Sequence, residues 1–301
     1  MKLATTTGDF SNFSKSHKEM LSYVKEAGFK YADLSLYDLD IKGNPFMENN
    51  WESYTYDLAD HAEKLGIKFV QAHSPGCRGN VLEKNEHYDY FIDATRRSIE
   101  ICGMLGIKNT VFHTGWKDGV DKKKYFEENA DFVRLFFDDM EKNDVRLCIE
   151  NSTKVNMGTK YFFLEGCEMN EFIDYVGHPL LKACWDVGHA KLEGHNYKDI
   201  VDLSKNLVAV HIHDNFNFDS HQMPLTGNMN MDEVMQGLVD AKYEGFFTFE
   251  AGWTFSPGSV RLPNLENERL RHIPIELKID AEKLLFKLGK WILSSYDVYE
   301  E

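Results

Sequence analysis

Histidine and acidic side chains follow short apolar runs throughout this 301-residue chain, most densely in HIHDNFNFDSH at residues 211–221. This segment comes directly after the apolar run LVAV and holds three histidines and two aspartates. Imidazole and carboxylate groups are common protein ligands of divalent metal ions. The segment is therefore either a polar turn rich in histidine or part of a metal site.

The same residue types end other apolar runs along the chain. They are His73, His113, Glu150, Asp186 with His189, His211 with His213, and Glu250. Five of the 12 histidines fall on these few positions. A single histidine at the end of a strand is more often a hydrogen-bonded structural residue than a ligand. Its repetition on run after run favours one shared site.

The two glutamates at these positions are the strongest indication of a metal. Glu150 and Glu250 follow apolar residues, and an unpaired buried carboxylate costs several kcal/mol. A salt bridge to a neighbouring lysine or arginine is the alternative explanation, but no strand-end position in this set carries either residue. A divalent cation would supply the missing positive charge. Carboxylates and imidazoles without a thiolate suit Mn, Mg, Co or Zn.

The elements that must position these side chains can be predicted from periodicity. Eight runs rich in β-branched and aromatic residues predict strands at residues 2–8, 31–37, 68–74, 109–115, 145–151, 181–189, 207–215 and 246–252. Helical periodicity lies between them, as at 17–28, 55–66, 90–106 and 125–143. Strand and helix alternate about every 35 residues, which is typical of a parallel sheet with crossover helices.

Eight such repeats predict a single-domain α/β fold, a (β/α)8 TIM barrel over residues 1–301. An open doubly wound sheet is the alternative, but the chain has no G-x-G-x-x-G phosphate turn. Strand ends of a barrel share one cavity, so the histidines and acids are expected to meet there. Residues 253–276 hold three of the seven prolines and are predicted to form an irregular insertion at this end. It could act as a lid, a substrate wall or a contact in a homo-oligomer.

Local spacing refines two of the motifs. His211 and His213 are two positions apart on a strand and should project to one face, with Ile212 on the other. In the segment DVGH, a chain turn should let Asp186 and His189 reach one cavity from different heights.

Composition limits the possible partners. Lysine and arginine number 34 against 49 acidic residues, so the formal charge is −15, which disfavours nucleic acids and anionic membranes. The first residues, MKLATTTGDF, lack the apolar core of a signal peptide, and no run is long enough to span a membrane. The five cysteines form no C-x-x-C pair. These features favour a cytoplasmic protein whose cysteines are mostly buried and reduced.

Four motifs in chain order resemble the xylose-isomerase-like TIM-barrel superfamily, which includes sugar and sugar-phosphate isomerases and epimerases, inosose dehydratase and endonuclease IV. They are CIEN at 148–151, WDVGH at 185–189, HIHDN at 211–215 and FEAG at 249–252. The resemblance implies a metal site of Glu150, Asp186, His211 and Glu250. Further metal ligands of endonuclease IV would fall on His73, His113, His189, Asp219 and His221. The segment DSHQMPLTGN, however, is also similar to the D-x-H-x-P-L-G loop of single-metal members.

The resemblance favours a metal-dependent isomerase or epimerase of a small sugar, sugar phosphate or related polyol. In that activity Glu150 and Glu250 would exchange a proton next to a carbonyl through an enediolate, and His189 and His213 would hold substrate oxygens. Aromatic walls are expected from Trp116, Trp185, Trp253 and Phe255. An inosose-type dehydratase, an endonuclease IV-like DNA-repair nuclease and a non-catalytic barrel are the alternatives. Ketose 3-epimerases follow the histidine of their seventh strand with E-N-x-R, whereas this chain has DNFN at 214–217 and no arginine, so the identity of the sugar stays open.

Overall fold

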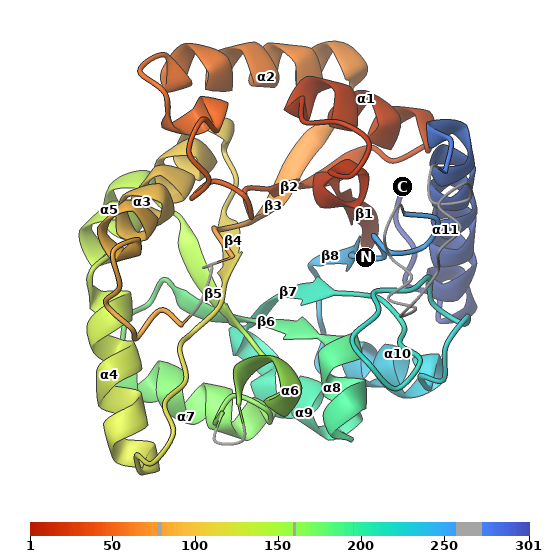
Figure 1. Cartoon of the computed structure of the whole chain (residues 1–301). Helices are drawn as coiled ribbons and strands as arrows, with labels where there is room; N and C mark the ends of the chain where they lie inside the picture. The colour runs from red at the N-terminus through yellow and green to blue at the C-terminus, as the bar shows by residue number, and fades with distance from the viewer. Residues whose placement is uncertain (77–79, 159–160, 195, 257–272) are drawn as a thin grey trace, which may run out of the picture.

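Eight parallel strands form the centre of the molecule, as the periodicity predicts (Figure 1). The structure is a computed structural model that describes residues 1–76, 80–158, 161–194, 196–256 and 273–301. The strands are β1 (Lys2–Thr6), β2 (Tyr31–Ser35), β3 (Lys68–His73), β4 (Asn109–Phe112), β5 (Arg146–Glu150), β6 (Leu181–Asp186), β7 (Leu207–His211) and β8 (Phe246–Phe249). Each lies within one of the eight predicted runs.

The sheet closes into a barrel. Each strand from β1 to β7 pairs with the next in the chain, and β1 also pairs with β8. The remaining seam between β7 and β8 is joined just beyond His211, where the Ile212 amide donates to Thr248 O at 2.9 Å. The Glu250 amide donates in turn to Ile212 O at 3.1 Å. The closing contact therefore sets His211 beside Glu250.

Helices surround the barrel (Figure 1). They are α1 (His17–Glu26), α2 (Trp51–Leu65), α3 (Tyr88–Leu105), α4 (Lys122–Arg134), α5 (Phe137–Asn143), α6 (Lys154–Met157), α7 (Gly166–Val176), α8 (Val187–Glu193), α9 (Tyr197–Leu203), α10 (Met231–Asp240) and α11 (Ile275–Ser295). Short 3-10 turns are η1 (Thr7–Phe10), η2 (Pro45–Met47) and η3 (Ser204–Asn206). Gly66 and Gly106 end α2 and α3 in the left-handed conformation that glycine permits.

One predicted helix, 125–143, proves to be two. The chain turns between α4 and α5, where Phe136 is fully buried and packs edge-on against Phe132 at a ring distance of 5.3 Å. Neither a proline nor a glycine marks this break, so periodicity alone could not reveal it.

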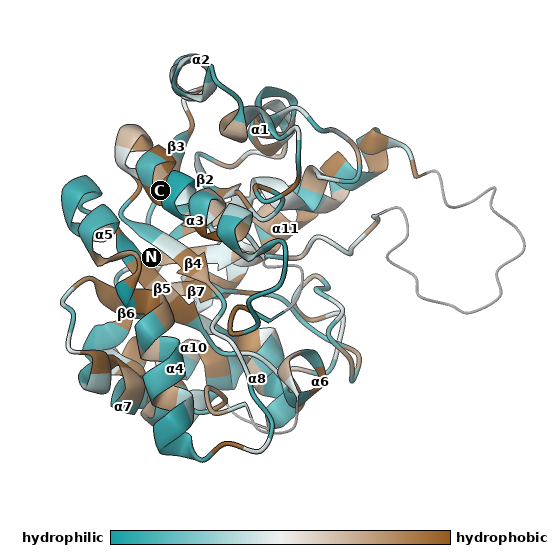
Figure 2. Ribbon diagram, turned by 60° about the vertical axis from the view of Figure 1, so that its left-hand side comes forward, coloured by the Kyte–Doolittle hydropathy of each residue, from teal (hydrophilic) through white to brown (hydrophobic). Residues whose placement is uncertain are grey.

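Apolar residues gather on the strands and on the inward sides of the helices, as Figure 2 shows. Cys102, Cys148 and Cys184 are buried as expected, whereas Cys167 is exposed. Most of the predicted insertion, residues 257–272, lies outside the described residues, and α11 already begins at Ile275. Within the described ranges, no helix is both long and apolar enough to cross a bilayer.

Candidate active site

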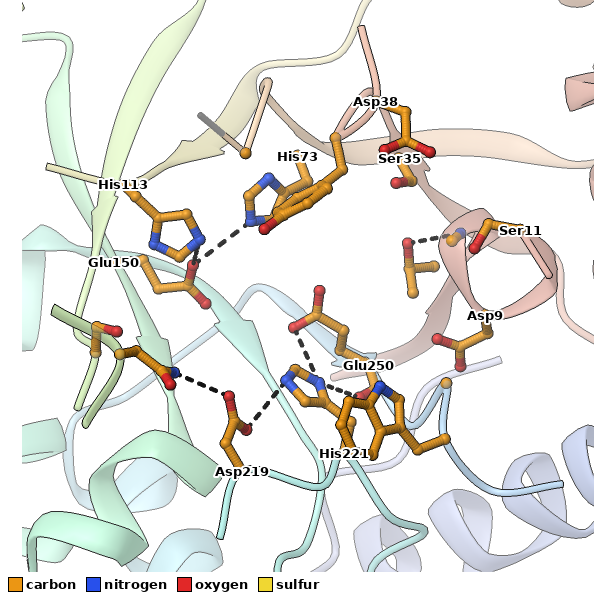
Figure 3. Close-up of a pocket in the computed structure, with 18 of the residues that line it drawn as sticks. Asp9, Ser11, Ser35, Asp38, His73, His113, Glu150, Asp219, His221 and Glu250 are labelled. Atoms are coloured by element: carbon orange, nitrogen blue, oxygen red, sulfur yellow. Dashed lines mark hydrogen bonds and ion pairs between the residues drawn. The ribbon is translucent and has the colours of Figure 1, made fainter. Parts of the chain in front are cut away.

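A cavity of about 1070 Å³ opens at the carboxyl ends of the strands (Figure 3). Of the predicted site residues, its lining includes His73, His113, Glu150, His189, Asp219, His221, Glu250, Trp116 and Trp253. Of the predicted residues outside this lining, Asp186, His211 and His213 are buried. The expectation that these side chains meet at one end of the barrel is therefore fulfilled by the geometry.

Strand periodicity explains how the barrel carries them. A small buried cluster fills the barrel interior, and each of its four members precedes a site residue by two positions. The four are Val111, Cys148, Cys184 and Ala209, which precede His113, Glu150, Asp186 and His211. Because alternate residues of a strand share a face, the apolar layer supports the polar layer directly above it.

Glu150 is the centre of the polar layer. It is 1% exposed, and its Oε1 lies 2.6 Å from His211 Nδ1. Its Oε2 lies 3.5 Å from His113 Nε2 and 3.6 Å from His73 Nε2, and in the described part of the chain this oxygen has no hydrogen-bond partner. Burial would raise the pKa of Glu150, but the charge of His211 and its hydrogen bond to the carboxylate hold that pKa well below its usual range.

Glu250 approaches the same histidine from β8. Its Oε2 lies 3.3 Å from His211 Nδ1, and its side chain is 23% exposed. Burial opposes a charge on His211, yet Glu250 and Glu150 raise the pKa of this imidazole well above its usual value. The buried Gln71 amide nitrogen lies 3.0 Å from His211 Nε2 and fixes the ring from its other side.

Asp186 ends β6 and caps α8. Its Oδ1 accepts the His189 amide at 2.7 Å, and its Oδ2 lies 3.0 Å from His213 Nε2. Burial is outweighed by the charges of His189 and His213, which lower the pKa of Asp186. Asn151 holds the backbone of Asp186 by two hydrogen bonds, of 2.6 and 2.8 Å. The turn predicted for DVGH is thus the first turn of a helix.

A further group lies toward the mouth of the cavity. Asp219 Oδ2 is 3.2 Å from His189 Nε2, and Asp219 Oδ1 is 3.1 Å from His221 Nε2. Burial favours a neutral His221, but the charge and hydrogen bond of Asp219 raise its pKa to about 10. The ring of His221 stacks on His213 at 3.9 Å. The loop 219–221 therefore joins the site instead of forming a separate surface feature.

These side chains form groups of the kind that holds metal ions. In each group the potential ligand atoms lie within 4.8 Å of one another. The groups are Glu150, Asp186, His211 and Glu250; His73, His113 and Glu150; His189, His213, Asp219 and His221; and Glu150, Cys184 and His211. Within the described ranges, neither Glu150 Oε2 nor the buried His113 Nδ1 has a hydrogen-bond partner. Burial lowers the pKa of His113 to about 4 and keeps this imidazole neutral, as a metal ligand must be.

Three predictions need correction. His213 lies beneath the cavity, fully buried against Asp186, and so does not line it as a residue that holds substrate would. Trp185 is in the core, where its Nε1 donates to Asn196 Oδ1 at 3.1 Å. Phe255 is exposed and does not belong to the described lining. Trp116 and Trp253 do line the cavity.

Sequence reasoning missed Gln71, Asn151 and Asp9. Gln71 precedes His73 by two positions on β3, a spacing that could have identified it. Asn151 directly follows Glu150. Asp9, in η1, lines the cavity although only 4% of it is exposed, and no strand-end pattern marks it.

Comparisons with known proteins agree with this architecture. A family model described as "Xylose isomerase-like TIM barrel" matches residues 21–264. A D-psicose 3-epimerase from Clostridium cellulolyticum H10, solved with D-tagatose, superposes with a TM-score of 0.74 at 17% identity, over 97% of this chain and 99% of that chain. A 3-keto-D-glucoside 4-epimerase from E. coli gives 0.70 at 17% identity, over 95% and 99%. An L-ribulose 3-epimerase gives 0.72 at 15% identity, over 97% and 94%. No curated protein matches. At these identities the structural likeness shows the fold alone.

Proposed function

Since this chain belongs to the xylose isomerase-like TIM-barrel family, we propose that it is a divalent-metal-dependent isomerase or epimerase of a small sugar or related polyol. The observation that carries the proposal is the group of Glu150, Asp186, His211 and Glu250, whose ligand atoms lie within 4.8 Å of one another at the cavity floor. Three carboxylates at this spacing repel one another unless a cation lies between them.

These four residues would hold the metal ion. When bound, the ion would polarise a substrate carbonyl and stabilise the negative charge that develops on its oxygen. Gln71 would orient His211, and Asn151 would fix the backbone of Asp186. The neighbouring His73, whose pKa is raised, would keep Glu150 ionised.

Two carboxylates are available for proton transfer. Glu250 is partly exposed and lines the cavity, so its carboxylate is accessible to a carbon-bound proton of the substrate. Glu150 also lines the cavity but is buried among imidazoles, and its lowered pKa makes it the weaker base. We assign the first abstraction to Glu250. Glu150, which is ionised, would first take up a proton from water in the cavity and then return it to the substrate carbon from its own side. His189 lines the cavity and would bind a substrate oxygen.

An inosose-type dehydratase would use the same groups. The difference lies in the fate of the carbanion equivalent, which expels a neighbouring hydroxyl as water instead of regaining a proton. Product analysis by NMR distinguishes the two reactions, because only dehydration loses a molecule of water.

A second candidate, an endonuclease IV-like nuclease, is favoured by the other two histidine and acid groups, centred on His73 with His113 and on Asp219 with His221. Binding of DNA depends on cationic side chains that neutralise its phosphates, whereas this chain has a formal charge of −15. In the described part of the cavity wall, Lys15 and Lys42 are the only lysines or arginines. We therefore rank the nuclease below the sugar enzyme.

The test combines metal analysis with solvent exchange. Protein purified without chelator is supplied with Mn, Mg, Co or Zn and incubated in D2O with ketoses, inososes and their phosphates. One exchangeable metal and deuterium at the carbon next to the carbonyl are expected. Three zinc ions per chain with cleavage of abasic DNA would support the nuclease, and a protein that binds no divalent metal would contradict both activities.

A further inference from the structure

The side of the cavity at the ends of β1 and β2 differs in character from the metal-type groups. Asp9, Ser11 and Ser35 line this side, and Figure 3 places them across the cavity from His113 and Glu150. Within the described ranges, no metal-type group includes any of the three. This side would therefore contact the substrate and not the metal ion.

Asp9 is the unusual residue here. It is 4% exposed, and its Oδ2 has no hydrogen-bond partner among the residues that the structure describes. A buried carboxyl group without a partner costs stability, so its presence in a folded protein needs an explanation. Such residues are tolerated where a ligand completes their hydrogen bonds.

The buried cation that acts on Asp9 is already engaged elsewhere. Lys278 of α11 lies 2.8 Å from Glu282 Oε1, and its Nζ donates to Thr254 O at 3.1 Å. Burial, and after it the charge of Glu282, raise the pKa of Asp9 well above its usual value. A neutral carboxylic acid both donates and accepts hydrogen bonds, as a sugar hydroxyl does.

The loop after β8 passes close to the carboxyl group of Asp9. A Cβ on residue 252 would lie 2.9 Å from Asp9 Oδ1, so a larger residue there would push the carboxyl group out of its present position. Gly252 and Asp9 both line the cavity. Because residue 252 has no side chain, the loop that follows Glu250 does not cover the carboxyl group of Asp9 there.

The surroundings of Asp9 do not suit an anion. The amide of Gly8, at the start of η1, donates to Thr6 Oγ1 at 3.1 Å and is not available to a phosphate. Lys15 and Lys42 are the only permanent cations among the described lining residues, and both are exposed. The hydroxyl groups and the carboxyl group on this side match hydroxyls.

We infer that this side is the subsite for an uncharged, hydroxyl-bearing end of the substrate, with Asp9 hydrogen-bonded to a substrate hydroxyl, so that the substrate is a free sugar or polyol and not its phosphate ester. The inference rests on the proposed function, which assigns the reacting end of the substrate to the Glu150 and Glu250 side. Ser11 and Ser35 supply further hydroxyl contacts to the same end.

The test is calorimetric titration of the Mn²⁺-loaded protein with D-tagatose, D-allulose and D-fructose 6-phosphate. Asp9→Leu keeps the volume and removes both oxygens, and Asp9→Asn keeps a donor and an acceptor. Asp57→Leu, at an exposed acid of α2, is the matched control. Melting temperatures of all variants are measured in parallel.

Wild-type protein is expected to bind a free ketose at least about tenfold more tightly than the phosphate, and Asp9→Leu to weaken ketose binding about 10- to 100-fold. Removal of an unpaired buried carboxyl should not lower the melting temperature, whereas a structural Asp9 would. Asp9→Asn should retain affinity within about threefold, and Asp57→Leu should match the wild type.

Equal or tighter binding of the phosphate, or unchanged ketose affinity in Asp9→Leu, would overturn the inference. Solvent deuterium exchange separates it from the proposed function. Ketose binding that depends on Asp9, without exchange in any sugar, would reject the isomerase and keep the subsite. Exchange together with ketose binding that does not depend on Asp9 would keep the isomerase and reject the subsite. A protein that binds no ketose would overturn both.

Discussion

Isosteric replacement of Glu150 and of Glu250 should separate stability from chemistry. Glu150→Gln is expected to lower the free energy of unfolding, and Glu250→Gln is expected to slow proton transfer. Glu250→Gln changes a side chain that is 23% exposed and contacts His211 at 3.3 Å and His221 at 3.7 Å. Contacts of this length at a partly exposed group contribute about 1 kcal/mol or less to the free energy of unfolding. Glu150→Gln changes a side chain that is 1% exposed and lies 2.6 Å from His211.

The cost of the second change is larger because it leaves buried charge uncompensated. In the metal-free protein, Glu150 is the shared counter-charge of His211 and His73, the two neighbouring imidazoles whose pKa values are raised. Breaking a buried ion pair by removal of one partner costs about 3–5 kcal/mol. We therefore expect Glu150→Gln to lose about this much stability in urea unfolding, while Glu250→Gln stays within about 1 kcal/mol of the wild type.

Proton exchange, unlike stability, should depend strongly on Glu250. At saturating metal, Glu250→Gln is expected to slow deuterium incorporation about 10²- to 10⁴-fold, the usual contribution of a general base. Proton NMR of the ketose in D2O follows the exchange, and a metal titration of each variant separates lost affinity from lost proton transfer. Glu244→Gln, at the opposite end of β8, is the matched control and should exchange at the wild-type rate.

Exchange within about tenfold of the wild-type rate in metal-saturated Glu250→Gln would refute its role as the base. A fully stable Glu150→Gln variant would refute the electrostatic account of the imidazole cluster. The two outcomes are independent, because one is measured on the chemical step and the other on the metal-free fold.

Other consequences of the structure can be measured on the same protein. Mn²⁺ added at pH 7 should displace about one proton, because the pKa of His211 is raised and a metal ligand must be deprotonated. Titration calorimetry in two buffers of different ionisation enthalpy measures the number of protons released. Binding without proton release would contradict the prediction. Burial lowers the pKa of His17 to about 4, so the unfolded chain takes up a proton there between pH 6.5 and 4 that the folded chain does not. His17→Phe should therefore reduce the loss of unfolding free energy between pH 7 and pH 4 by about 3 kcal/mol, and an unchanged pH profile would be inconsistent with this. Lys278→Met strands the buried Glu282 and should cost about 3–5 kcal/mol, most of which Lys278→Met/Glu282→Leu recovers; equal stabilities of the single and double variants in urea would argue against a buried pair.

Much of the fold and of the site could be predicted from local sequence. All eight strands fall within the predicted runs, because parallel strands covered on both faces are short, continuous apolar segments. The side chains that end those runs include Glu150, Asp186, His211 and Glu250, which the structure brings within 4.8 Å. Periodicity of two along a strand and a shared cavity at the strand ends are enough to predict that these groups meet.

Other features depend on contacts between residues far apart in the chain. Gln71 orients His211 across 140 positions, and the seam at Ile212 sets Glu250 beside that histidine. His213 is on the expected side of its strand, but the stacking of His221 and the carboxylate of Asp186 bury it below the cavity. Periodicity gives a side chain's direction, whereas its depth depends on what packs over it.

Asp9 shows the same division most clearly. The sequence around it, TTTGDF, is an ordinary polar turn after the first strand. The groups that act on it, Gly252 beside its Oδ1 and the charges of the Lys278–Glu282 pair of α11, lie more than 200 positions later in the chain. The sequence by itself determined the barrel and the set of metal-type ligands, because both follow from local periodicity. Only the tertiary structure decided that the carboxyl group of Asp9 is buried beside the substrate cavity, because burial is a property of the neighbours that the fold supplies.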